Sequence, residues 1–201
     1  MIIQKSQSTY RSSIRAAITG LWREQISRSD FQDAMIVAIN RGYHQAAIEG
    51  AKVCGVSADE MTIEELRKVE ELVNNEKQYI DNLADDIEAG NKASGGKIAD
   101  LIYRADLWSN RYGEVRTIIQ LMVCKDAKMK WIYGDTDHCN SCLDLNGRVY
   151  RASVWSKANV WPQGRMLECK GFRCKCRLEP TDDRVTSGRF PSLKSGKKKK
   201  R

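Results

Sequence analysis

Five cysteines crowd into the last third of the chain, and they constrain its fold more than any other feature. Cys139 and Cys142 stand three positions apart, and Cys169, Cys174 and Cys176 all follow within the next 34 residues. A segment of about 50 residues buries too little apolar surface to fold readily alone, and it is commonly held by a metal ion or by disulfides. The sequence therefore predicts a small module that is stapled at its cysteines.

The first pair has the spacing of a chelating loop in which two thiolates bind one tetrahedral zinc ion. The other ligands must come from Cys169, Cys174 and Cys176, so five thiols compete for four positions. We favour Cys139, Cys142, Cys169 and Cys174, with Cys176 as the first substitute. The expected cofactor is one structural zinc ion held by four of these five residues.

Two other readings of the cysteines stay open. The five thiols can simply be reduced side chains in a small β core, and a redox Cys-x-x-Cys is a weaker possibility because no βαβ pattern surrounds it. His138 can in principle bind the metal, but it directly precedes a better ligand. We therefore expect it to have a surface role.

The remaining cysteines, Cys54 and Cys124, lie in segments with a helical pattern. We expect them to act as small buried apolar groups. Seven cysteines in a chain whose first residues carry no apolar run of signal-peptide length favour thiols or metal over a disulfide framework. No apolar run approaches the length of a membrane span, so we expect a soluble protein made in the cytoplasm.

Residues 1–125 are expected to form helices. Apolar residues recur at spacings of three and four from Ile14 to Ile26 and again from Phe31 to Ala47. Ser57 with Glu60, or Thr62 with Glu65, makes a capping box for a third helix that continues to about residue 87. A fourth helix runs from about residue 98 to 122. Four amphipathic helices can bury their apolar faces against each other or against a partner.

Residues 126–180 have the features of a small β module. The stretch KMKWIYGD alternates polar and apolar residues, Asn146-Gly147 predicts a hairpin with a type I′ turn, and GFRCKCRLEP alternates up to Pro180. Residues 181–201 lack periodicity and predict a flexible basic tail. The fold class is thus α+β, with a helical assembly region, a zinc-ribbon-like module and a disordered tail.

Positive charge is concentrated at the carboxy-terminal end. Of the net charge of +8, six charges lie in Lys194, residues 197–200 and Arg201, which leaves +2 for residues 1–193. One interpretation is a zinc-ribbon protein that binds nucleic acid through this tail, helped by basic residues of the module and by stacking of bases on Trp155 and Trp161. A zinc deaminase is excluded because its His-x-Glu and Pro-Cys-x-x-Cys motifs are missing.

The cysteine segment resembles the carboxy-terminal module of phage Mu F-like head morphogenesis proteins. Members typically show Cys-x-x-Cys near L-x-G-x-V and then a C-R-C-x-L-x-P ending. The residues that match are Trp131, Asp137, Cys139, Cys142, Leu145, Gly147, Val149, Cys174, Cys176, Leu178 and Pro180. The similarity spans roughly residues 30–180. Where the family often has P-x-H-P, this chain has ECKGF, with Cys169 in place of the histidine.

The resemblance implies a minor capsid protein that takes part in head morphogenesis at the portal. Its partners would be portal or capsid proteins, with DNA as a further partner through the basic tail, and it would bind neither a membrane nor a small-molecule substrate. It would reside in the phage head, and in the host cytoplasm during assembly. Because thiolates fill all the expected zinc positions and leave no place for a reactive water, we expect no enzymatic activity.

Overall fold

The computed structural model describes the backbone of residues 2–193 and the side chains of residues 6–193. Most of the chain is helical, and a small antiparallel sheet lies near the carboxy-terminal end. The elements, in chain order, are α1 (Ile2–Trp22), α2 (Arg28–Lys52), the 3-10 helix η1 (Ala58–Glu60), α3 (Ile63–Lys77), α4 (Ile80–Ala89), α5 (Ile98–Val123), β1 (Lys128–Ile132), α6 (Asn140–Leu145), β2 (Val149–Arg151), α7 (Ala152–Lys157) and β3 (Arg177–Pro180).

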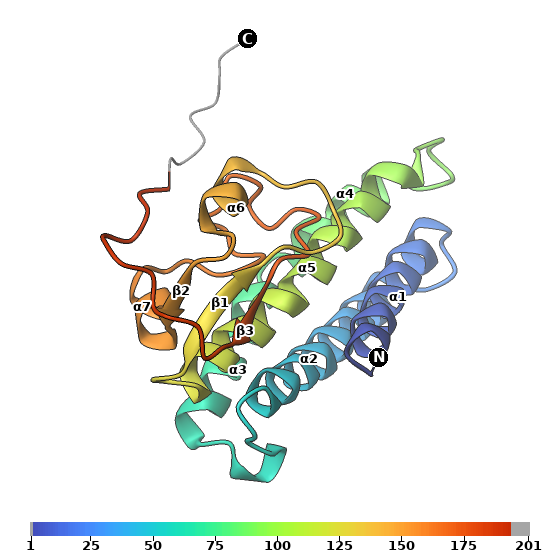
Figure 1. Ribbon diagram of the computed structural model, residues 1–201. Coiled ribbons are helices and arrows are strands. Elements are labelled where there is room, and N and C mark those ends of the chain that lie inside the picture. Colours follow the sequence, from blue (N-terminus) through green and yellow to red (C-terminus); the bar gives the residue numbers. More distant parts are fainter. Residues whose placement is uncertain (1, 194–201) are drawn as a thin grey trace.

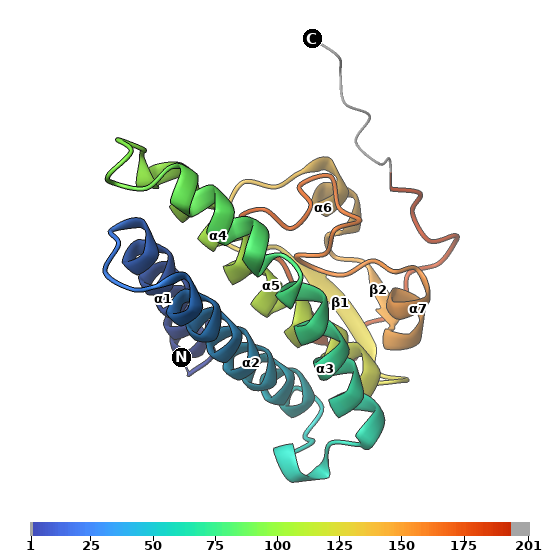
Figure 2. The same ribbon diagram turned by 180° about the vertical axis from the view of Figure 1, so that it is seen from behind.

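Helix α5 lies at the centre of the molecule. Helices α1 and α2 lie along one side of it, and the sheet with α6 and α7 lies on the other (Figure 1). The view from behind shows α4 and α3 following one another alongside α1 and α2 (Figure 2). We call residues 2–125 the helical region and residues 126–180 the cysteine module. Within residues 2–193, no helix combines the length and apolarity that crossing a membrane requires.

The helix starts follow the polar residues at their ends. Ser27 caps α2 through a reciprocal pair of bonds with Asp30, and Thr62 with Glu65 does the same for α3. Ser57 opens only the short η1. The single long helix expected after Thr62 is divided near Gln78, where α3 ends and α4 begins. The division lets α3 and α4 turn their apolar faces separately toward the other helices.

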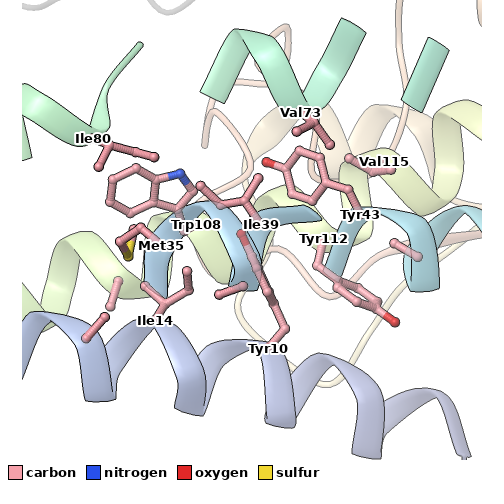
Figure 3. Packing of buried hydrophobic residues seen from close by; sticks show 14 of the residues in the cluster. Tyr10, Ile14, Met35, Ile39, Tyr43, Val73, Ile80, Trp108, Tyr112 and Val115 are labelled. Atoms are coloured by element: carbon pink, nitrogen blue, oxygen red, sulfur yellow. The ribbon is translucent and has the colours of Figure 1, made fainter. Parts of the chain in front are cut away.

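The core of the helical region is built where α1, α2 and α5 meet. Figure 3 shows Tyr10 and Ile14 of α1 reaching toward Met35, Ile39 and Tyr43 of α2, with residues of α3, α4 and α5 closing over them. All five of these side chains are buried. The apolar spacing seen in the sequence thus corresponds to the buried faces of the helices.

A glycine allows two of these helices to approach closely. A Cβ atom at Gly50 of α2 would lie 2.2 Å from the carbonyl oxygen of Arg116 in α5. That distance is far below any real Cβ contact, and the obstacle is backbone that cannot rotate away. The α2–α5 packing therefore depends on the absence of a side chain at this position.

The sheet of the module has the order β2-β1-β3, and both pairs are antiparallel. Met129 of β1 faces Tyr150 of β2, and Trp131 faces Leu178 of β3. These four side chains are buried in one cluster with Trp155 of α7. The indole nitrogen of Trp155 donates a hydrogen bond to the carbonyl oxygen of Met129, at 3.0 Å. The one polar group of this buried ring therefore has a hydrogen-bond partner.

The hairpin predicted at Asn146-Gly147 is wrong. The residues before it form helix α6, and the strand that follows, β2, pairs with β1 instead of with its neighbour. Asn146 has a φ of −57° and Gly147 a φ of +74°, which is the geometry of a type II turn. The Gly147 amide donates to the Trp131 carbonyl at 2.9 Å. The turn is closed by the Arg148 amide on the Leu145 carbonyl, at 3.0 Å, and is also tied to the distant strand β1.

Residues 181–193 pack against the module instead of forming the flexible segment expected from residue 181. The Phe190 ring lies 5.1 Å from that of Tyr150 and 5.4 Å from that of Trp155, between ring centroids. Thr186 exchanges two hydrogen bonds with the backbone of Val149, each of 2.9 Å. The expectation failed because Phe190 finds an apolar surface that periodicity does not reveal. The lysine-rich residues 194–201 lie outside the described part of the chain.

The module rests on α5 through polar and apolar contacts. The side-chain amide of Gln120 donates to the carbonyl oxygen of Leu178 at 2.9 Å, in a buried position. Leu121 and Cys124 at the end of α5 belong to the apolar cluster of the module. Arg165 of the module lies 3.3 Å from the carboxylate of Glu76 in α3. The two regions thus share one continuous interface along α5.

Candidate metal centre

The first two cysteines of the centre lie at the beginning of α6. Cys139 is the residue that precedes the helix, with an extended backbone, and Cys142 lies in its first turn. This geometry brings the two sulfur atoms to within 3.6 Å of each other. Two sulfurs bound to one zinc ion at about 2.3 Å in a tetrahedron lie about 3.8 Å apart. The pair is thus arranged as a chelating loop.

The other three cysteines are carried by the loop between α7 and β3. Lys170, Gly171 and Arg173 all have positive φ angles, of 50°, 81° and 49°. The resulting tight turns are closed by hydrogen bonds from the Phe172 amide to the Cys169 carbonyl, at 2.8 Å, and from the amide of Cys174 to the Gly171 carbonyl. The loop folds back on itself and turns all three thiols toward α6.

Polar contacts hold this loop against α6. The carboxylate of Glu168 accepts hydrogen bonds from the backbone amide of Asn140, at 2.9 Å, and from its side chain, at 3.3 Å. The Glu168 amide in turn donates to the hydroxyl of Ser141, at 3.0 Å. These bonds join residues next to Cys139 with residues next to Cys169, so they hold the two halves of the centre together.

All five predicted ligands come together in one cluster. The sulfurs of Cys139, Cys142 and Cys169 lie within 4.8 Å of one another, and so do those of Cys142, Cys174 and Cys176. Cys142 belongs to both groups. The two groups could each hold a metal ion, and the buried positions of Cys142, Cys174 and Cys176 exclude water from much of the centre.

The close thiols change each other's protonation. Hydrogen bonds from the Cys142 and Cys174 thiols lower the pKa values of Cys169 and Cys176. The same contact with Cys169, reinforced by Cys174, Cys176 and burial, raises the pKa of Cys142. The cluster therefore shares protons among its sulfurs when no cation is bound. A divalent cation can replace these protons and stabilise the thiolates together.

His138 lies next to the cluster, a position that the sequence reasoning missed. Its Nδ1 atom is 3.7 Å from the sulfur of Cys176. The imidazole is stacked on the ring of Tyr133, with a centroid distance of 3.9 Å and an interplanar angle of 12°. The only signal in the sequence was the adjacency of His138 to Cys139, which does not reveal the direction of the side chain.

The interpretation of Cys54 and Cys124 as isolated apolar groups is wrong. They form a disulfide that links the segment after α2 to the end of α5, across 70 residues of sequence. Both cysteines follow helices whose ends meet beside the module, so their separation in the sequence says nothing of their proximity. The five cysteines of the centre are free thiols.

The tryptophans considered for stacking on nucleic-acid bases are both engaged within the protein. Trp155 is fully buried in the module, with 0% of its surface exposed. The indole nitrogen of half-buried Trp161 donates to the carboxylate of Glu114 at 3.3 Å. A base cannot stack on Trp155, and Trp161 belongs to the interface with α5. The lysine-rich tail of that hypothesis lies outside residues 2–193.

The geometry described here is that of a thiol-rich centre that could hold metal, in a small module docked on a helical region. No protein family, curated protein or solved structure matches this chain.

Proposed function

We propose that this chain is a structural protein of a phage head, a minor capsid component at the portal, whose cysteine module is held by zinc. The observation that carries the proposal is the convergence of the five cysteines in one cluster. Cys139, Cys142, Cys174 and Cys176 belong to the pattern by which the sequence resembles the phage head proteins. Cys169, which stands in place of the family's histidine, joins the same cluster.

Zinc is the metal that this donor set suits best. Thiolate sulfurs select zinc over calcium or magnesium, which prefer oxygen ligands. The excess of sulfur ligands also bears on the role of the ion. A catalytic zinc keeps one position for water, whereas here protein sulfurs are available for every position. The proposed ion is therefore structural, and the proposed protein is not an enzyme.

An assembly role is supported by the way in which the module is attached. A rigid module that rests on α5 presents a fixed outer surface, and α1 with α2 presents another on the far side of α5 (Figures 1 and 2). A protein that joins two components of a particle needs two such surfaces in a constant relation. The proposed partners are portal and capsid proteins, with DNA as a further partner through the basic tail.

The test is peptide mass spectrometry of density-purified particles from the strain that carries the gene. We expect the protein in the particles at a few copies each, quantified against the major capsid protein. Its absence from particles, with abundant protein in the lysate, would contradict a virion component. In that case, salt-dependent DNA binding by the full chain, lost on removal of residues 194–201, would support the nucleic-acid-binding alternative.

A further inference from the structure

The metal centre contains more ligand atoms than one tetrahedral ion can use. The cluster contains five free thiols, and the imidazole of His138 lies beside it, whereas one zinc ion binds four ligands. Two potential ligands would then be left beside a filled site. Thiols that bind no ion have no need to converge in one buried cluster. The positions of the two extra ligands can therefore indicate whether a second ion binds.

The sulfurs are not spread evenly about one centre. Cys142 contacts the thiols of Cys169, Cys174 and Cys176 in addition to its 3.6 Å neighbour Cys139. Cys174 contacts Cys142, Cys169 and Cys176. Cys142 and Cys174 thus lie in the middle of the cluster, and the other three lie around them.

The outer ligands fall on two sides of this middle pair. On one side are Cys139 and Cys169, which form a group with Cys142; Cys174 contacts Cys169 but lies outside the 4.8 Å spread of that group. On the other side is Cys176, which forms a group with Cys142 and Cys174. His138 lies on that second side, because its Nδ1 atom is 3.7 Å from the Cys176 sulfur. A sulfur and a nitrogen on one zinc ion lie about 3.6 Å apart.

We propose that the centre holds two zinc ions that share the thiolates of Cys142 and Cys174. The first ion is completed by Cys139 and Cys169. The second is completed by Cys176 and the Nδ1 atom of His138. Sharing of two cysteines by two zinc ions is a known arrangement, since six cysteines hold two ions in the Zn₂Cys₆ modules. Here an imidazole takes the place of one terminal thiolate.

The charge of the centre favours this arrangement over a single ion. One divalent cation with four thiolates carries two net negative charges in a largely buried site and leaves the fifth thiol protonated, whereas two cations with five thiolates carry one. Burial of uncompensated charge is costly in a protein interior. The stacking of His138 on Tyr133 supports the second ion as well, because it holds the ring with Nδ1 toward Cys176.

The inference rests on the proposed zinc centre, and metal stoichiometry separates the two. The full chain is produced with zinc, freed of loosely bound metal by gel filtration, and analysed by plasma mass spectrometry. We expect two zinc ions per chain. One ion per chain would overturn the binuclear centre and leave the structural zinc intact, while no zinc would overturn both.

Two variants test where the second ion binds. His138→Ala and Cys176→Ser should each reduce the content from two ions to one, with unchanged helical circular dichroism. His44→Ala is the matched control, because His44 is the other histidine and lies on α2 beside Glu70; it should retain two. Retention of two ions in His138→Ala would overturn the role of this residue.

The bridging sulfurs can be tested without any amino-acid substitution. With cadmium-113 in place of zinc, the wild-type chain should give two nuclear magnetic resonance signals that are coupled to each other through the shared thiolates. Two uncoupled signals would overturn the bridge, and a single signal would overturn the second ion. This measurement decides the matter even if the cysteine variant does not fold.

Discussion

The helical region buries 26 apolar residues in one cluster, all of them among the described residues, whereas the cluster of the module contains 14. Three of those 14 are cysteines of the metal centre, and the three strands have only five, three and four residues. Helices that bury continuous apolar faces are stabilised by that burial. We expect a module with short strands and a small core to depend far more on its cysteine cluster and on the metal ion proposed there.

Loss of the Cys142 thiolate should have the largest effect, because it should destabilise the module and spare the helical region. Cys142→Ser is expected to release metal and to unfold the module, since binding of structural zinc contributes on the order of 10 kcal/mol. The helices should persist, because their core lies on the other side of α5. The loss of the contribution of Trp131 and Trp155 to the near-ultraviolet circular dichroism reports on the module, and the far-ultraviolet signal reports on the helices.

The matched control for this variant is Leu143→Ser in the same helix α6. Leu143 is 53% exposed and adjoins the cysteine without contributing a ligand. It should keep its metal and its melting transition. A Cys142→Ser protein with full metal content and an unchanged near-ultraviolet spectrum would show that the module does not depend on the centre.

A cavity in the helical core should lower the unfolding free energy without releasing metal. Phe31 of α2 is fully buried, so Phe31→Ala is expected to cost about 3–5 kcal/mol of unfolding free energy. Metal content should not change. Urea denaturation followed by circular dichroism gives the first quantity and metal analysis the second. Val37→Ala, at a position 47% exposed on the same helix, should cost much less. Metal loss in Phe31→Ala would contradict the separation of the two regions.

The sequence predicted the helical region in more detail than the module because helix formation is governed by near neighbours. The apolar spacing and the predicted capping pair of Thr62 with Glu65 each lie within a few residues of one another. In the module, the strand that follows the Asn146-Gly147 turn pairs with the distant strand β1 and not with the residues before the turn. Such a contact depends on the tertiary fold and leaves no local pattern.

The metal centre shows the same limit. The convergence of the five cysteines could be predicted from their clustering and from the spacing of the first pair. Their distribution around Cys142 and the approach of His138 could not, because both depend on how the loop before β3 folds back toward α6. The disulfide of Cys54 with Cys124 was hidden for a related reason, since it joins residues 70 positions apart.

That disulfide should have a smaller effect than the core of either region. It closes a long loop that contains α3, α4 and the whole of α5, and loss of such a bridge typically costs about 2–4 kcal/mol. The double variant Cys54→Ser, Cys124→Ser should be destabilised by this amount in urea while its metal content is unchanged. A thiol reductant should destabilise the wild-type protein to a similar extent and have no further effect on the variant. Equal stability of the two proteins without reductant would argue against the bridge.

The smallest expected effect concerns the charge at the interface between the two regions. Glu76 of α3 is buried, with its carboxylate 3.3 Å from Arg165 of the module and 3.0 Å from the indole nitrogen of Trp108. Burial raises the pKa of this carboxyl above its ordinary value of 4.5, although Arg111 and Arg165 oppose the shift. As pH rises, the Glu76 carboxyl therefore loses its proton at a lower pH in the unfolded chain than in the folded protein.

The sign of the resulting pH dependence follows from this proton. As pH rises above 4.5, the folded state binds more protons than the unfolded state at Glu76, so this group makes the protein progressively less stable until the carboxyl ionises in the folded state as well. Glu76→Gln removes the titration and keeps an acceptor for Trp108. Its unfolding free energy should therefore fall less steeply than that of the wild type above pH 4.5. Glu71→Gln, exposed on the same helix, should keep the wild-type slope. If both variants have the wild-type slope, the pKa of Glu76 is not raised by its burial at the interface.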